Sequence, residues 1–218
     1  MDLNAFLTKI SVYAIPVLFA ITLHEVAHGW TARYFGDRTA ELLGRLSLNP
    51  LRHIDPVGTV LIPGLLLLAG GLLFGWAKPV PVASSALRNP RRAMILVALV
   101  GPAANLLMAV MWCGVLAAIA RSTVNDTLDY WIGLMAQAGI VTNAVLAVFN
   151  LLPIPPLDGG RVLSSLLRPA LGARLESIAP AGFIIVLGLS VFGLLGWLFN
   201  PTLRLVGRVI YVLMRPSA

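Results

Sequence analysis

Charged side chains are scarce in this sequence. Only 11% of the 218 residues are Asp, Glu, Lys or Arg, whereas a soluble domain carries about 25%. Hydrophobic residues make up 58% of the chain, and the mean hydropathy is +0.88. This composition excludes an ordinary soluble domain and places the chain in the membrane class.

Cysteine is almost absent as well. Cys113 stands alone within an apolar run, which excludes a disulfide framework within the chain, and we expect it to be a small buried or lipid-facing residue. The sequence also lacks Ser-rich or acidic linkers and repeats at a fixed period. It therefore predicts one membrane-embedded domain over residues 1–218.

Acidic residues are few relative to basic ones, 9 against 16, which gives a net charge of +7. A basic excess can indicate nucleic acid, but here the arginines fall in the short gaps between apolar runs. That placement is typical of anionic lipid headgroups and of the positive-inside bias. We expect a lipid bilayer and no nucleic acid as partner, and a prokaryotic plasma membrane as the location.

Five stretches contain no Asp, Glu, Lys or Arg, and a membrane-spanning helix needs about 20 apolar residues. Residues 57–77, 93–120, 130–157 and 177–203 are long enough, and 10–23 becomes so if its helix continues to Ala32. Residues 57–77 contain several Gly and Pro residues and have basic flanks on both sides, which favours a re-entrant hairpin. We expect an all-α polytopic membrane protein with about four or five membrane helices.

Two further segments mix polar and apolar residues. In residues 36–56, Leu46 and Leu48 alternate with polar neighbours, so a short strand or loop follows the first helix. Residues 204–215 space three arginines among apolar residues, as in a helix on the membrane interface. Loop charges place His28 and Asp158 near the same, cytoplasmic, side of the membrane.

An H-E-x-x-H sequence, His24-Glu25-Val26-Ala27-His28, lies at the end of the first apolar stretch. Its histidines are four residues apart and share a helix face, so both rings can reach one metal ion, while Glu25 can reach a metal-bound water. Zinc lowers the pKa of such a water toward about 7, and Glu25 can act as general base. Histidines satisfied by backbone carbonyls are the alternative. Three ionisable residues in a membrane segment, at roughly a few kcal/mol each, favour a metal site.

A catalytic zinc ion takes three protein ligands and keeps a fourth position open. Soluble relatives of the motif supply a nearby third His, but Tyr34 stands at that place here. Asp37 and Glu41 are close in sequence, yet both lie among arginines. A more distant acid must therefore be considered.

Asp158 is the better candidate for the third ligand, because it ends a long uncharged run. Prolines before it break the helix, and Gly159 and Gly160 after it permit close approach of the backbone. The ordinary alternative is that Asp158 caps the N-terminus of a new helix, and the two roles are compatible.

Three spaced motifs resemble the site-2 protease family of intramembrane metalloproteases. They are the H-E-x-x-H sequence, Gly101-Pro-Ala-Ala-Asn105, and Asn150-Leu-Leu-Pro-Ile-Pro-Pro-Leu-Asp158-Gly159. The similarity runs from about Ile10 to Leu167. Without a visible PDZ domain, the chain is similar to the short bacterial and archaeal branch of the family.

The resemblance implies one zinc ion held by His24, His28 and Asp158, with Glu25 as the catalytic base. It also implies that Asn105 lies near the scissile bond, where its amide could donate to the oxyanion. Asn105 could equally be a helix-packing residue beside the small residues that precede it. The implied substrates are transmembrane or membrane-anchored proteins.

Two other polar residues have open roles. Asn150 could hold substrate or hydrogen-bond the broken backbone before Pro153, and we favour structural support. His53 could be a fourth metal ligand or a substrate contact, and we favour a loop histidine paired with Asp55.

The competing functional class is a metal-binding membrane transporter or sensor, because His, Glu and Asp inside membranes also line ion pathways. That class predicts polar groups strung across the bilayer. Here they gather near one side, and the stretch 93–120 offers only Asn105.

Overall fold

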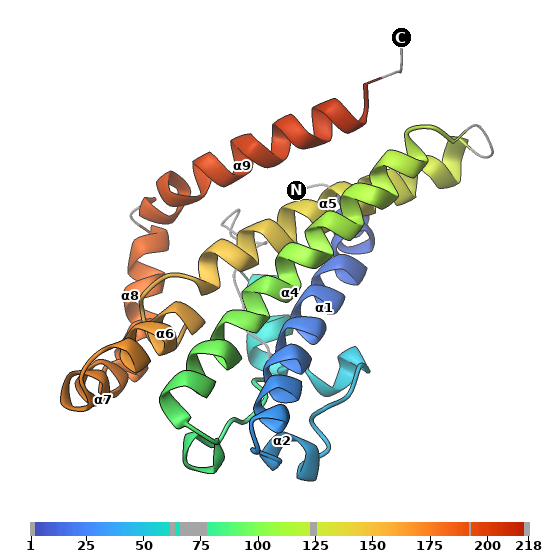
Figure 1. Ribbon diagram of the computed structural model, residues 1–218. Coiled ribbons are helices and arrows are strands. Elements are labelled where there is room, and N and C mark those ends of the chain that lie inside the picture. Colours follow the sequence, from blue (N-terminus) through green and yellow to red (C-terminus); the bar gives the residue numbers. More distant parts are fainter. Residues whose placement is uncertain (1–2, 62–63, 66–77, 123–125, 192, 216–218) are drawn as a thin grey trace.

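The computed structural model describes residues 3–61, 64–65, 78–122, 126–191 and 193–215 (Figure 1). These residues form helices joined by turns and loops, as the all-α prediction requires. The longer helices are α1 (Leu3–Tyr34), α4 (Pro90–Ile119), α5 (Asp126–Asn150), α6 (Asp158–Leu166), α7 (Pro169–Ser177), α8 (Ala179–Val191) and α9 (Leu194–Leu213).

Helices α1, α4 and α5 form the centre of the molecule, and α4 packs against the other two. Figure 1 shows α4 antiparallel to α1 and α5, so the second half of α1, the start of α4 and the end of α5 lie at one end of the bundle. Pro90 begins α4 at a position where its missing N–H costs no helical hydrogen bond. At Gly139 on α5, an added Cβ would lie 2.5 Å from the Trp112 ring of α4, which shows how closely these helices approach.

Within the described residues, three helices are long and apolar enough to cross a membrane: Leu7–Tyr34, Pro90–Ile119 and Thr127–Asn150. A fourth span is possible if the bent pair Pro169–Ser177 and Ala179–Val186, with 49° between its helices, counts as one. The first helix continues through His24 and His28, as predicted. The chain is thus a multi-pass membrane protein, and its described residues contain three or four spans where four or five membrane helices were predicted.

The C-terminal part differs from the prediction. Residues 177–203 are not one continuous span, because α8 ends at Val191 and α9 begins at Leu194. Gly193 precedes α9 with a φ of 73°, a left-handed conformation that glycine adopts without a steric penalty. The helix predicted over residues 204–215 is present but begins earlier, because α9 starts at Leu194 and extends through Arg204 and Arg208 to Leu213. Its location on the membrane interface stays a prediction.

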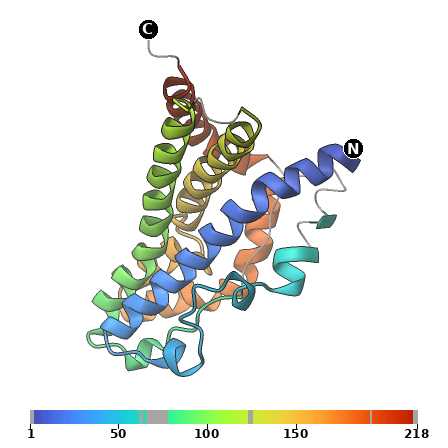
Figure 2. The ribbon, with the colours of Figure 1, turned by 90° about the vertical axis from the view of Figure 1, so that its right-hand side faces the viewer.

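Short helical turns occupy the region between α1 and α4: α2 (Thr39–Leu42), η1 (Pro50–Arg52), η2 (Pro56–Leu61) and η3 (Ser84–Ala86). Residues 45–49 are irregular, so of the two predicted possibilities, strand or loop, the structure has the loop. The predicted re-entrant hairpin at 57–77 lies mostly outside the described residues. Figure 2 shows that the segment after α1 and the segment before α4 meet at the same end of the bundle.

Asp37 ties these two segments together. Its side chain is 1% exposed, and its carboxylate accepts hydrogen bonds from the Thr39 N–H at 2.9 Å, the Thr39 hydroxyl at 2.5 Å and the Ala83 N–H at 2.7 Å. Burial raises the pKa of the Asp37 carboxyl, but the bonds from Thr39 and Ala83 outweigh it, so the pKa lies below its ordinary value. The ionised carboxylate therefore stabilises the junction.

We expect Asp37 to make the stability of the protein pH-dependent. Because its folded-state pKa is lowered, its contribution is complete above the unfolded-state value of about 4 and is lost as the pH falls through the lower folded-state value. Thermal unfolding in detergent should show Asp37→Asn less stable than the native chain at neutral pH. The difference should narrow toward about pH 3. A difference that stays constant over this range would contradict an ionised Asp37.

Candidate metal centre

His24 and His28 project from the same face of α1. They are one helical turn apart, and both side chains are buried. Their ring centroids lie 4.6 Å apart, and the two Nε2 atoms are separated by 3.0 Å. The i, i+4 spacing of the motif thus brings both ring nitrogens to one point.

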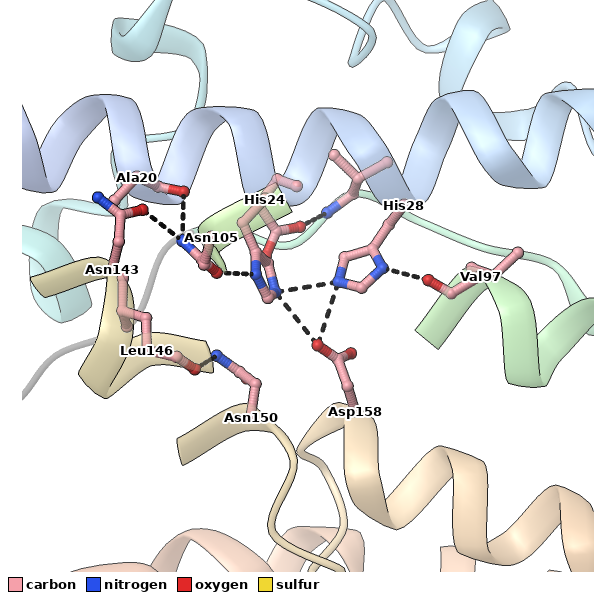
Figure 3. A network of polar contacts seen from close by, with 11 residues as sticks. Ala20, His24, His28, Val97, Asn105, Asn143, Leu146, Asn150 and Asp158 are labelled. Atoms are coloured by element: carbon pink, nitrogen blue, oxygen red, sulfur yellow. Dashed lines mark hydrogen bonds and ion pairs between the residues drawn. The ribbon is translucent and has the colours of Figure 1, made fainter. Parts of the chain in front are cut away.

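Asp158 reaches that point from another part of the chain. After α5 ends at Asn150, a proline-containing turn reverses the chain, and Asp158 is the first residue of α6. Its Oδ2 lies 3.2 Å from His24 Nε2 and 3.3 Å from His28 Nε2, and in Figure 3 the carboxylate points toward both rings. Leu157 occupies the N-cap position, so the Asp158 carboxylate faces the histidines instead of capping the helix.

The glycines after Asp158 allow this approach. A Cβ at Gly159 would lie 2.2 Å from the Leu151 carbonyl oxygen, and a Cβ at Gly160 would lie 2.4 Å from the Pro155 nitrogen. A larger residue at either position would push α6 away from the turn. The close approach expected of these two glycines is therefore present.

The hydrogen-bond partners of the two Nδ1 atoms show which nitrogen of each imidazole ring carries the hydrogen. His28 Nδ1 lies 2.6 Å from the Val97 carbonyl oxygen, which can only accept, so this Nδ1 carries a hydrogen. His24 Nδ1 lies 2.6 Å from Asn105 Oδ1 and likewise donates. Two neutral rings would then direct their Nε2 lone pairs, together with Asp158 Oδ2, at one position. Three converging acceptors without a hydrogen between them suit a bound cation.

The three potential ligand atoms also suit zinc. Each of the three residues offers one ligand atom, and these atoms lie within 4.8 Å of one another. Two imidazole nitrogens and one carboxylate oxygen are typical of catalytic zinc sites, and bonds from the opposite ring nitrogens commonly orient such ligands. Asp158 Oδ2 is buried and has no hydrogen-bond donor among the described residues, as expected for an atom that binds a cation.

Asn105 contacts the site from the side of His24. It is completely buried, its Oδ1 accepts from His24, and its amide donates to the Ala20 carbonyl at 3.3 Å and to Asn143 Oδ1 at 3.0 Å (Figure 3). Both amide hydrogens are thus bonded within the protein. This arrangement favours orientation of His24, whereas donation to a substrate oxyanion would require these bonds to break.

Gly101 makes room for the imidazole rings on α4. A Cβ built there would lie 2.5 Å from His28 Nε2 and 2.6 Å from His24 Cε1. Because real Cβ atoms do not approach other atoms so closely, no other residue fits without moving the rings. The small residue in the Gly101-to-Asn105 motif is therefore a requirement of the metal centre.

Glu25 is half-buried and follows His24 directly. Its Oε2 accepts a hydrogen bond of 2.7 Å from the backbone N–H of Val80, in the segment that precedes α4. The residue predicted as general base therefore lies beside the candidate ligands and is held from outside α1.

The other residues considered for the site have hydrogen-bond partners outside the three candidate ligands. His53 is buried, and its Nε2 contacts the Ser47 carbonyl at 2.8 Å, while Asp55 accepts from backbone N–H groups of its own turn. The Asn150 amide donates to the Leu146 carbonyl of its own helix. Glu41 forms ion pairs with Arg33 and Arg38. Cys113 is a free, partly buried thiol packed beside the core formed by α4 and α5.

Comparison with known proteins agrees with this geometry. The family model described as "Peptidase family M50" matches residues 114–192, which include Asp158. "Putative zinc metalloprotease YwhC" of Bacillus subtilis is 39% identical over 192 residues, covering 87% of this chain and 84% of the relative. The chain belongs to peptidase family M50. This is the site-2 protease family, so the resemblance carried by the three motifs is confirmed, as is the prediction of a metalloprotease.

Other M50 relatives are longer. "Putative zinc metalloprotease Rip2" of Mycolicibacterium smegmatis is 33% identical over 194 residues, covering 84% of this chain and 71% of the relative. The protein of the same name in Mycobacterium tuberculosis (strain H37Rv) is 34% identical over 194 residues, with the same coverage. No solved structure matches the chain.

Three contacts around this M50 site were not predicted from the sequence. Asn143 is completely buried and bonds to Asn105, and an Asn in the middle of the uncharged run 130–157 was a signal that could have found it. The Val97 carbonyl and the Val80 N–H are backbone groups. Every residue type has such groups, so the sequence could not show that these two contact His28 and Glu25.

We expect Gly101→Ala to lower zinc content sharply, because the added methyl group would displace both imidazole rings. Metal analysis of the purified protein measures this. Gly114→Ala is the matched control on the same helix, since a Cβ there meets nothing within 4 Å, and it should keep native zinc content. Equal zinc in the two variants would contradict the close fit at Gly101.

Asn105→Ala should weaken zinc binding by about tenfold to a hundredfold, as loss of a residue that orients a metal ligand typically does. Competition with a chelator of known affinity measures the change. Asn150→Ala is the control, because the Asn150 amide is bonded to its own helix. Native affinity in Asn105→Ala would show that Asn105 does not orient His24.

Proposed function

We propose that this chain is an intramembrane zinc metalloprotease that hydrolyses peptide bonds of transmembrane or membrane-anchored proteins. The observation that carries the proposal is the convergence of His24 Nε2, His28 Nε2 and Asp158 Oδ2 on one buried position, with Glu25 adjacent, in a member of peptidase family M50. We further propose that residues 1–218 act as a single membrane-embedded domain and that the membrane is a prokaryotic plasma membrane.

In this proposal His24, His28 and Asp158 bind one zinc ion. Zinc in such a site supplies a Lewis acid and lowers the pKa of a bound water. The chain contributes the orientation of its ligands: Val97 fixes the His28 ring, and Asn105, itself held by Ala20 and Asn143, fixes the His24 ring. Ligands fixed in this way lose little freedom when the metal binds.

Glu25 would carry the proton through the reaction. As the water oxygen attacks the carbonyl carbon of the scissile bond, a Glu25 carboxylate oxygen accepts the proton. When the C–N bond breaks, the same carboxyl group donates that proton to the leaving nitrogen. The contact between Glu25 Oε2 and Val80 keeps the carboxylate in one orientation for both transfers.

The membrane location restricts the substrate. A peptide bond within a helix is shielded by its own hydrogen bonds, so a membrane-embedded substrate must unwind locally before it can be cut. Segments containing Gly, Pro or polar residues, which weaken a membrane helix, fit this requirement best. A bilayer-embedded protein is therefore the proposed substrate class.

The alternative of a transporter or sensor gains no support from the arrangement of polar groups. The buried His and Asn side chains on α1, α4 and α5 join Asp158 in one network. A conduction path would need further polar groups along the spans.

Glu25→Gln should keep about one zinc per chain and lose at least about a hundredfold of its cleavage rate, because the amide cannot accept the proton. The measurement is cleavage of a labelled single-span membrane protein in detergent, with zinc content measured on the same samples. A native cleavage rate in Glu25→Gln would show that Glu25 is not the general base.

Asp158→Ala should lose both zinc and cleavage, because two histidines alone hold the metal weakly. Asp129→Asn is the control, since it changes a carboxylate near the opposite end of α5 from the site. If Asp158→Ala retained full zinc content, Asp158 would not be the third ligand.

A further inference from the structure

A short segment between α1 and α4 is built to present one hydrogen-bond donor. Pro79 and Pro81 have no backbone N–H, and Val80 lies between them. The rings also restrict the backbone, because proline fixes its own φ and keeps the preceding residue extended. The single N–H of this Pro-Val-Pro segment, residues 79–81, is the one that donates to Glu25 Oε2 at 2.7 Å.

The Pro-Val-Pro segment is also seated against α1. The Val80 side chain is 4% exposed. A Cβ at Gly29, one turn after Glu25, would lie 2.9 Å from Val80 Cγ1 and 2.3 Å from Leu46 Cδ2. The glycine thus lets both side chains pack directly on the helix backbone. This packing sets the distance between the segment and Glu25.

Arg45 and His53 hold the segment at its N-terminal end. The Lys78 N–H donates to the His53 carbonyl at 3.0 Å, and Arg45 Nη2 donates to the carbonyls of Lys78 at 2.7 Å and Pro79 at 3.4 Å. The backbone is thus bonded from two directions directly before Val80.

Asp37 holds the segment at its C-terminal end. Its Oδ2 accepts from the Ala83 N–H at 2.7 Å, while its Oδ1 is bonded to Thr39. Asp37 contributes no metal ligand and lies beyond the end of α1. A buried carboxylate is costly unless it is fully hydrogen-bonded, and here its bonds join the turn that follows α1 to the segment that contacts Glu25.

We propose that Val80 is a positioning residue for Glu25, and that Asp37 and Arg45 fix the segment that carries it. The inference rests on the proposed role of Glu25 as base. A carboxylate on a flexible side chain has several rotamers, and a backbone N–H held at both ends of its segment selects one of them. Reaction rates depend steeply on such orientation. The candidate ligands His24 and His28 lie on a different face of α1 and Asp158 lies on α6, so the segment acts on the base and not on the metal.

The test compares Val80→Pro, which removes the N–H from an already extended segment, with Val80→Ala, which keeps the N–H and removes the side-chain packing. Zinc content, kcat and KM are measured for both with the labelled single-span membrane protein in detergent. We expect about one zinc per chain in each. The kcat of Val80→Pro should lie about tenfold or more below that of Val80→Ala, with KM changed by less than about twofold.

Asp37→Asn is the second variant, and it tests the positioning of Glu25 if Val80→Pro does not fold. The amide that replaces the carboxylate has one acceptor atom instead of two, so it cannot accept from both Ala83 and Thr39. We expect a fall in kcat with zinc retained. Equal kcat in Val80→Pro and Val80→Ala, a change in KM alone, or native kcat in Asp37→Asn would overturn the proposal. Full cleavage by Glu25→Gln would instead show that Glu25 is not the general base, which contradicts the proposed function.

Discussion

The structure depends on one electrostatic constraint, the placement of three proton acceptors at a single buried position. His24 Nε2, His28 Nε2 and Asp158 Oδ2 lie 3.0 to 3.3 Å apart, and both Nδ1 hydrogens point away from them. In a low-dielectric interior such a cluster is unfavourable without a compensating positive charge. The bonds to Val97 and Asn105 keep the rings in this arrangement, so the neighbouring helices hold three acceptors in positions that suit a cation.

That constraint explains the small residues near the site. Gly101 on α4 and Gly159 on α6 are positions where a Cβ would strike the imidazole rings or the Leu151 carbonyl. Helices that carry bulky side chains cannot bring three ligands from α1 and α6 to one point beneath α4. Glycine weakens a helix interior, and its use here is compensated by the packing and the metal ligands that it permits.

The sequence predicted which candidate site residues lie together better than it predicted the topology. His24, Glu25 and His28 have a fixed spacing, and Asp158 was conspicuous as an acid ending an uncharged run, so local pattern was sufficient. The prediction of one span over 177–203 was wrong because a hydropathy pattern does not reveal the left-handed turn at Gly193. The role of Asn105 depended on where its amide hydrogens go, which only the positions of Ala20 and Asn143 determine.

Helix α1 presents the residues of its H-E-x-x-H motif on two of its faces. One face presents His24 and His28 to α4 and Asp158, and the adjoining face presents Glu25 and Gly29 to the Pro-Val-Pro segment and Leu46. Residues one apart on a helix differ by about 100° in direction, so an H-E-x-x-H motif cannot direct all its side chains at one neighbour. The irregular segments between α1 and α4 supply the second neighbour. Backbone without regular structure at membrane depth is tolerated where protein buries it, and here its polar groups are bonded to Arg45, Asp37 and Glu25.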